Sequence, residues 1–404
     1  MNTLRRGDSC ASRGSGPATW LAVALFGALA GCGEGGGEES AAGAAAAGEP
    51  TAAAEAAAEA AVVPKVARAD RLARERAAAL LRLPVLEAAP LAAEFAVAVA
   101  ALAEHESLKR FVQLGDDWLP KSAARGWLDF AGDVLARAPD AAALERPFGV
   151  LVDLEAQLAR SGCHLLLVPV PSRLQLEPEL LLPALTGHAA PVARVAATTR
   201  FLADLAAAGV ESVDLAPALM AERDDPDPRR ARLWLRGNNH WAPRGAEVAA
   251  RAVAARLREM EWFAHGPLRD GVDFSVARRL GQCRGEGVGQ AEGAPPEAVG
   301  VDAVEWRTAA PTAEVARMSP LLLLGDSFAG MHKELKASFV DQLIRHSGWP
   351  VDVIAPQGGA ELACREALAR RDAPLASKRV VIWLLPEPLL APSGAWKRVA
   401  IGGS

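Results

Sequence analysis

A serine and a histidine in two short segments have the residue types of a nucleophile and its base. Ser327 stands in Gly-Asp-Ser-Phe, directly after the apolar run 321–324. His240 stands in Asn-Asn-His-Trp, shortly before Pro243, which can start a helix. A serine hydroxyl attacks poorly until a base takes its proton, and imidazole often serves as that base. Ser327 is therefore a candidate nucleophile and His240 its candidate general base.

The surroundings of Ser327 suit this chemistry. The run 321–324 predicts a strand buried on both faces, and Gly325 allows a sharp turn at its end. Helical spacing over residues 329–344 places Ser327 at a helix N-terminus, outside the strand end, where N–H groups favour an oxyanion. The alternative is that Asp326 or Ser327 only caps this helix.

A catalytic imidazole also needs a partner on its second nitrogen, usually a carboxylate. Asn238, two residues before His240, offers an oxygen for the Nδ1 proton but no negative charge. The alternative partner is an acid in the preceding loop: Asp224, Asp225 or Asp227. His332 is a weaker candidate base, because its place in the predicted helix is typical of a helix-face histidine.

Apolar strands alternate with helices from about residue 146 onward. Strands are expected at 164–170, 210–215, 321–324, 351–355 and 379–385. Helices are expected at 147–161, 191–208, 244–263, 329–344 and 361–371. Residues 264–318, rich in Gly and Pro, are expected to form a long loop. This alternation predicts an α/β fold with a parallel sheet covered on both faces.

Residues 1–32 have the features of a targeting segment. Arg5, Arg6 and Arg13 precede an apolar stretch, 20–29, that is too short for a convincing spanning helix. The stretch ends in Leu-Ala-Gly-Cys, which resembles a bacterial lipobox, so Cys32 is the expected lipidation site. An ordinary signal peptide or an uncleaved anchor is the alternative. Because Gly33 follows rather than Asp, we expect a periplasmic, lipid-anchored protein, at the outer membrane in a Gram-negative cell.

The rest of the N-terminal region divides by composition. Residues 33–63 are mostly Gly, Ala and Glu and are expected to be a disordered tether. Residues 64–109 are expected to be a helical extension that Pro84 and Pro90 interrupt. The main domain, 110–395, begins with a short strand at 111–114. Two acids follow it, and they are candidate functional groups or part of a turn before a buried Trp: Asp116 and Asp117.

Composition narrows the function classes. The 404 residues are 51% hydrophobic and 23% charged, which is typical of a globular chain. A net charge of −5 and the lack of an aromatic-basic patch argue against nucleic-acid binding. His and Cys positions show no metal-ligand spacing, so no metal is expected. After Cys32 an odd number of cysteines remains, compatible with one disulfide and one free thiol in any pairing of Cys163, Cys283 and Cys364.

Four segments, in order, resemble the SGNH-hydrolase-like domain of the alginate O-acetyltransferase AlgX/AlgJ family. Residues 115–119 loosely match its Gly-x-x-Gly-Trp-Leu start, and 168–173 match its Pro-x-Lys strand end with Arg173 for Lys. Residues 237–241 match its Thr-Asp-Thr-His-Trp motif, and 325–328 match Gly-Asp-Ser-Phe fully. The resemblance spans about 110–390, and its last two motifs are the more specific ones.

The resemblance implies a three-layer α/β/α domain that transfers acetyl groups to an exopolysaccharide, such as an alginate-like polymer, outside the cytoplasm. Ser327 would be the acetylated nucleophile and His240 the general base, without a cofactor. The family's aspartate falls on Asn238, which is the main departure. The oxyanion hole would come from the Ser327 N–H and the backbone at Gly358 and Gly359, which are alternatively a plain strand-to-helix turn.

Three functions therefore remain open. The first is an active O-acetyltransferase or acetylesterase, for which the resemblance implies a membrane O-acyltransferase that delivers acetyl groups and neighbouring export proteins as partners. The second is a catalytically impaired polysaccharide-binding or scaffold protein of an exopolysaccharide export system. The third is an SGNH esterase of another substrate.

Overall fold

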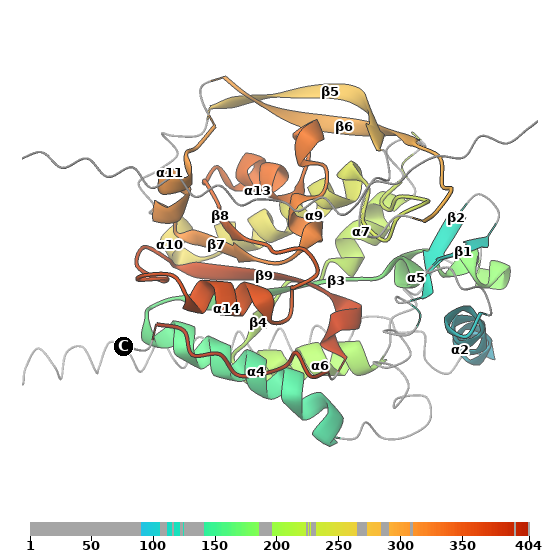
Figure 1. Ribbon diagram of the computed structural model, residues 1–404, viewed down its shortest axis with the longest axis horizontal. Coiled ribbons are helices and arrows are strands. Elements are labelled where there is room, and N and C mark those ends of the chain that lie inside the picture. Colours follow the sequence, from blue (N-terminus) through green and yellow to red (C-terminus); the bar gives the residue numbers. More distant parts are fainter. Residues whose placement is uncertain are drawn as a thin grey trace, which may run out of the picture. The chain divides into compact units, whose positions relative to one another are not determined.

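The computed structural model (Figure 1) describes the chain from residue 90 onward, with gaps. The described residues are 90–105, 111–114, 117–121, 124, 141–185, 196–223, 225, 227, 232–264, 273–283, 291–307, 310–391 and 393–402. All of them belong to one unit, Ala57–Ser404. The expected signal peptide and tether lie outside the described residues, as do Pro84, Gly115, Asp116 and Asp224.

A five-stranded parallel sheet forms the centre, as predicted. Its order is β4-β3-β9-β7-β8. The strands are β3 (His164–Val170), β4 (Glu211–Ser212), β7 (Leu321–Leu324), β8 (Asp352–Ile354) and β9 (Val380–Pro386). Strand β4 is shorter than the expected 210–215 because it pairs with β3 at only two positions. Strand β9 lies between β3 and β7, so their carboxyl ends meet at one edge.

Helices cover both faces of the sheet (Figure 1), which confirms the three-layer α/β/α prediction. One face packs against α4 (Ala141–Arg160), α6 (Ala196–Ala207) and α14 (Ala363–Ala369) through Leu165, Leu167, Leu322, Leu324, Val381 and Trp383. Helix α2 (Pro90–Ala103) contributes to the same apolar cluster. The other face packs against α7 (Ala216–Arg223), α9 (Pro243–Arg258) and α13 (Phe339–Ser347) through Leu166, Val168, Leu321, Leu323, Val380 and Ile382. Side chains alternate between the faces of a strand, so strands buried on both faces are apolar throughout.

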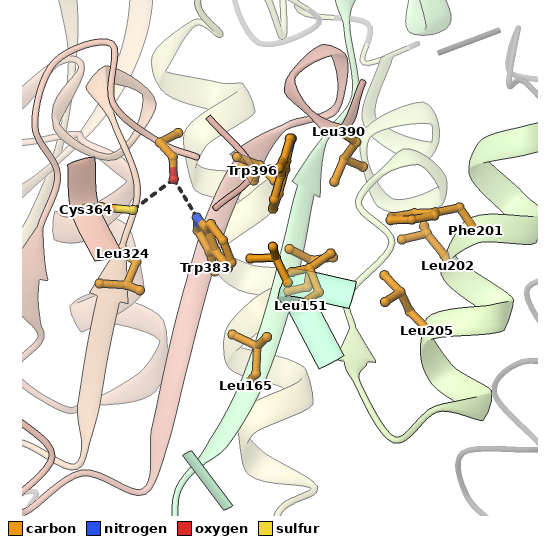
Figure 2. Packing of buried hydrophobic residues seen from close by; sticks show 14 of the residues in the cluster. Leu151, Leu165, Phe201, Leu202, Leu205, Leu324, Cys364, Trp383, Leu390 and Trp396 are labelled. Atoms are coloured by element: carbon orange, nitrogen blue, oxygen red, sulfur yellow. Dashed lines mark hydrogen bonds between the residues drawn. The ribbon is translucent and has the colours of Figure 1, made fainter. Parts of the chain in front are cut away.

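Hydrogen bonds fix the turn that follows β8 (Figure 2). The Ala360 carbonyl accepts the indole N–H of Trp383 at 2.8 Å and the thiol of Cys364 at 2.8 Å. Arg365 lies over the rings of Trp383 and Trp396 and donates to main-chain carbonyls near the C-terminus. The turn from β8 into α14 is therefore attached to the centre of the sheet.

The expected long loop at 264–318 is wrong. Residues there form an antiparallel hairpin of β5 (Phe274–Cys283) and β6 (Glu297–Trp306), followed by α11 (Ala313–Met318). Figure 1 shows the hairpin lying over α9 and α13. Most side chains of β5 are exposed, so its sequence shows no clear apolar alternation. The strand is held by pairing with β6 at ten positions.

The expected single helix over 329–344 is also wrong. The chain forms α12 (Ser327–Gly330), the 3₁₀ turn η3 (Lys333–Leu335) and then α13. His332 and Lys336 adopt positive φ angles of 72° and 56°, which interrupts a right-handed helix. Ser338 then caps α13 by accepting the N–H of Asp341.

The remaining elements are short. They are β1 (Phe111–Leu114), β2 (Asp117–Pro120), α5 (Arg173–Leu176), η1 (Pro178–Leu180), η2 (Pro183–Leu185), α10 (Glu261–Ala264) and η4 (Glu387–Leu390). Pro90 is the first residue of α2, a position where the helix needs no N–H partner. Within the described ranges, none of the helices combines the length and the hydropathy needed to cross a bilayer.

Candidate active site

Ser327 begins the one-turn helix α12 directly beyond the end of β7. The Gly325 N–H donates to Ile354 of the neighbouring strand at 3.1 Å, which holds the turn to the sheet edge. Asp326 is the N-cap, because its Oδ1 accepts the N–H of Phe328 at 2.9 Å. The capping alternative thus explains Asp326 and leaves the Ser327 hydroxyl for another role.

His240 lies on the second arm of a short hairpin-like segment just before α9. Trp234 and Trp241 form an antiparallel bridge. The N–H of Leu235 donates to the His240 carbonyl at 3.1 Å. Gly245 lets α9 approach this segment, since a Cβ there would collide with the carbonyl of Leu233. The backbone that carries the imidazole is therefore well supported.

The two segments meet at the sheet edge. Nε2 of His240 lies 2.8 Å from Oγ of Ser327, and Nδ1 lies 2.6 Å from Oδ1 of Asn238. The backbone N–H of His240 donates to the same Oδ1 at 3.1 Å, so the oxygen of the amide must face the ring. Nδ1 therefore carries the proton, and Nε2 is free to accept the hydroxyl proton of Ser327.

The imidazole of His240 is buried and has no charged hydrogen-bond partner. The residue is 2% exposed and its ring lies against Phe328. Burial lowers the pKa of His240 from 6.5 to about 4, with a smaller contribution from repulsion by His332. A carboxylate on Nδ1 would oppose this shift, but the neutral amide of Asn238 does not. The imidazole is thus neutral at physiological pH and poorly stabilised once protonated.

Of the other candidates for a base or its partner, Asp225 and His332 have contacts of their own, and Asp224 lies outside the described residues. Asp225 Oδ1 accepts the backbone N–H of Asp227 at 2.9 Å, while Nδ1 of His240 already has Asn238. His332 does not lie on a helix face as expected. It is a buried residue in the turn after α12, and its Nε2 is 2.8 Å from the Trp241 carbonyl.

Arg173 is a supporting residue whose role the sequence did not reveal. It forms ion pairs with Asp117 at 2.6 Å and Glu177 at 2.7 Å. Its guanidinium also lies 3.4 Å from the carbonyls of Leu235 and Arg236, just before Asn238. Asp117 is therefore engaged by an arginine rather than available as an acid. The sequence signals for Arg173 were its place at the end of a strand and its match to the Lys of the family's Pro-x-Lys motif.

Gly358 and Gly359 lie in the turn after β8, at the same edge as Ser327, because β8 pairs in parallel with β7. The backbone conformation at Gly358 and the lack of space at Gly359 each explain why the residue is glycine. Gly358 has φ of 65°, and a Cβ on Gly359 would lie 2.6 Å from that of Ala363. Their place is compatible with an oxyanion hole, and the turn alone also accounts for them.

The three cysteines that the structure describes are buried free thiols, so the expected disulfide among them is not formed: Cys163, Cys283 and Cys364. Burial raises the pKa values of Cys283 and Cys364 to about 12, which keeps both thiols protonated. In the part of the chain that the structure describes, no group of three or more His, Cys, Asp or Glu side chains gathers where it could hold a metal.

A parallel sheet between two helical layers, with Ser327 beyond one strand and His240 on a separate loop, defines an SGNH-hydrolase-like protein. The family model of the SGNH hydrolase-like domain of acetyltransferase AlgX matches residues 121–387, well over half of the chain. The chain therefore belongs to this family.

Three proteins are similar to this chain to different extents. The probable alginate O-acetylase AlgJ of Pseudomonas aeruginosa is 32% identical over 135 residues, which are 33% of this chain and 32% of that protein. This chain thus matches about a third of that relative's length. The O-acetyltransferase domain of Pseudomonas putida AlgJ has a TM-score of 0.51 at 19% identity, over 72% of this chain and 94% of that one, which shows a shared fold. AlgX of Pseudomonas aeruginosa has a TM-score of 0.44 at 21% identity, over 60% and 56% of the chains.

Proposed function

We propose that this chain is an O-acetyltransferase or acetylesterase that works through an acetylated Ser327. The observation that carries the proposal is the 2.8 Å contact between Nε2 of His240 and Oγ of Ser327, with Nδ1 protonated and held by Asn238. This is the geometry in which a neutral imidazole removes the hydroxyl proton while oxygen attacks a carbonyl.

The first half-reaction forms the acetyl-enzyme. Oγ of Ser327 attacks the acetyl carbonyl of the donor ester as its proton passes to Nε2 of His240. The oxyanion is stabilised by the Ser327 N–H and the backbone of Gly358 and Gly359. The tetrahedral intermediate then collapses, the bond to the donor alcohol breaks, and the alcohol leaves with the proton from Nε2.

The second half-reaction transfers the acetyl group. A hydroxyl of the acceptor sugar, or water in the esterase reaction, gives its proton to Nε2 and attacks the acetyl-serine. Collapse releases the acetylated sugar, or acetate, and returns the proton to Ser327. Asn238 keeps the ring oriented in both halves but adds no charge to the imidazolium that forms in each.

The proposed acceptor is an exopolysaccharide such as an alginate-like polymer, outside the cytoplasm. The family membership and the likeness to a probable alginate O-acetylase support this class of acceptor. A membrane O-acyltransferase that supplies acetyl groups and neighbouring export proteins are the proposed partners. Lipidation at Cys32 would anchor the protein in the periplasm through the segment 33–63.

Asn238 favours one second candidate, a scaffold or polysaccharide-binding protein with impaired turnover. In a serine protease, the Asp-to-Asn change at this position of the triad costs about 10⁴ in kcat. A comparable loss here would leave binding as the main activity of the domain.

The test uses a chromogenic acetyl ester and mass spectrometry of the protein. Wild type should release the alcohol and carry one acetyl group on Ser327, and Ser327→Ala should do neither. Ser275→Ala removes an exposed serine on β5 and serves as the matched control. Polysaccharide binding without ester turnover or acetyl-enzyme in wild type would favour the scaffold. Hydrolysis of many esters without transfer to a polysaccharide would indicate an esterase of another substrate.

A further inference from the structure

The peptide group that joins Trp241 to Ala242 is fixed at both of its polar atoms. The Ala242 N–H donates to the Leu233 carbonyl at 2.8 Å, within the hairpin-like segment that carries His240. The Trp241 carbonyl accepts from Nε2 of His332 at 2.8 Å. This second bond comes from the turn that follows Ser327, 91 residues further along the chain.

The tautomer of His332 follows from its two neighbours. A carbonyl oxygen only accepts, so Nε2 carries the proton and Nδ1 has a lone pair. Nδ1 lies 3.5 Å from Sγ of Cys283, at the end of β5, so the thiol is the donor there. His332 is 6% exposed and Cys283 is 8% exposed. Burial lowers the pKa of His332 to about 4 and raises that of Cys283 to about 12, in agreement with a neutral pair.

The backbone of His332 is also unusual. Its φ of 72° lies in the left-handed region, which glycine and asparagine enter more easily than histidine. The carbonyl of His332 accepts the N–H of Leu335 at 3.0 Å and that of Ala337 at 3.2 Å, so the turn is ordered around it. A histidine here is therefore explained by its side chain rather than by the conformation of its backbone.

The side chain of Trp241 is held by residues that follow Ser327. Its ring contacts Phe328 edge-on with centroids 5.2 Å apart and stacks on Phe339 at 5.7 Å. The ring contacts fix where Trp241 sits, and the bond from His332 fixes the direction of its carbonyl. Both act one residue away from His240.

We propose that His332 is a positioning residue for His240, holding the backbone of the base in register with Ser327 through the Trp241 carbonyl, in a tautomer that this carbonyl requires and the Cys283 thiol supports as a donor to Nδ1. The proposal rests on the proposed function, since it concerns the base of that reaction. His332 itself touches neither the substrate nor the reacting atoms.

Two substitutions separate the side chain from the backbone. His332→Asn readily takes the left-handed conformation but is too short to reach the Trp241 carbonyl. His332→Gln places an amide N–H near the position of Nε2. One readout is the ¹⁵N NMR spectrum of the histidine-labelled protein, which reports the tautomer of the His240 ring without any turnover. The other is the split of acetyl-ester hydrolysis into kcat and KM.

We expect a single Nδ1–H tautomer of His240 in wild type. His332→Asn should give a mixed or shifted His240 signal and lower kcat by about 10- to 100-fold with little change in KM, because a small misplacement of the base is costly. His332→Gln should restore most of the wild-type His240 signal and most of the wild-type kcat. A wild-type His240 signal and kcat in His332→Asn would overturn the proposal. So would a folded His332→Gln protein that behaves like His332→Asn.

If His332→Asn does not fold, the proposal can be tested at Cys283, which contacts Nδ1 of His332. Cys283→Ser keeps a donor for Nδ1 of His332, and Cys283→Ala removes it. A shifted His240 signal in Cys283→Ala but not in Cys283→Ser supports the proposal, and identical signals in both contradict it. A wild type without ester turnover whose His240 signal still responds to these changes would disprove the proposed function but not the positioning by His332.

Discussion

Oδ1 of Asn238 accepts both the Nδ1–H of His240 at 2.6 Å and the backbone N–H of the same residue at 3.1 Å. In the serine-protease example, Asn in place of Asp is damaging because the ring takes the wrong tautomer. Here the backbone N–H keeps the amide oxygen toward the ring, so the tautomer is the productive one. The remaining deficit is the missing negative charge.

The first prediction concerns the pH dependence of kcat/KM for a small acetyl ester. The rate should fall as pH drops through the pKa of His240, because a protonated imidazole cannot accept the Ser327 proton. Since burial lowers this pKa to about 4, the inflection should lie near pH 4 instead of near neutrality. Burial raises the pKa of Asp326, the residue before the nucleophile, to about 6, so the ionisation of Asp326 could also produce an inflection in acid. Asp326→Asn keeps a good N-cap and is the control; an inflection that disappears in this variant would belong to Asp326.

The second prediction concerns the missing charge. Asn238→Asp should raise the rate of acetyl-ester hydrolysis at neutral pH by about 10- to 100-fold, because a carboxylate stabilises the imidazolium. The inflection in kcat/KM should move to higher pH at the same time. Ser327→Ala should abolish the rate in either background. An unchanged rate in Asn238→Asp would indicate that an acid such as Asp224 already serves His240.

The third prediction concerns acid stability. A histidine whose folded pKa is about 4 and whose unfolded pKa is about 6.5 stabilises the fold above pH 6.5 and loses that contribution as pH falls toward 4. The free energy of unfolding of wild type should therefore fall more steeply over this range than that of His240→Gln, by on the order of 3 kcal/mol. Urea titrations of both proteins at several pH values measure the difference, and contributions shared by the two proteins, such as that of Asp326, cancel. Parallel curves would contradict the assignment.

The fourth prediction concerns Arg173. Arg173→Ala removes the ion pairs with Asp117 and Glu177 and the contacts to the carbonyls just before Asn238. Breaking such a buried ion pair costs about 3–5 kcal/mol of unfolding free energy. Arg200→Ala is the matched control, because its pair with Asp204 is exposed and should change stability by less than about 1 kcal/mol. Equal urea midpoints for the two variants would show that Arg173 is not a structural support.

The fifth prediction concerns location. Cys32→Ala should move the protein from the membrane fraction to the soluble periplasmic or extracellular fraction, because the lipid attachment site is lost. Cell fractionation with mass spectrometry of the N-terminal peptide checks both the location and the lipid. A wild-type protein that is soluble and carries no lipid would refute the anchor.

The sequence by itself determined the central sheet and the segments of the site. Strands buried on both faces must be apolar throughout, and this property needs no knowledge of their neighbours, so β3 and β7 were predicted with their observed bounds. The turn at Gly325 and the start of α9 at Pro243 are likewise local features. Ser327 and His240 were found because their short motifs are contiguous in the chain.

Only the tertiary structure decided what these segments touch. The hairpin depends on pairing between β5, which exposes most of its side chains, and β6, which buries Val299, Val301 and Ala303 at alternate positions. Strand β5 had no apolar signature, and the short alternation in β6 was not recognised within a Gly- and Pro-rich segment. The orientation of Asn238 depends on a backbone N–H, and the low pKa of His240 depends on burial. The contact of Arg173 with Asp117 joins residues 56 positions apart, and that of His332 with Trp241 joins residues 91 positions apart. Distances and desolvation of this kind arise only after the chain has packed, and no local pattern of residues encodes them.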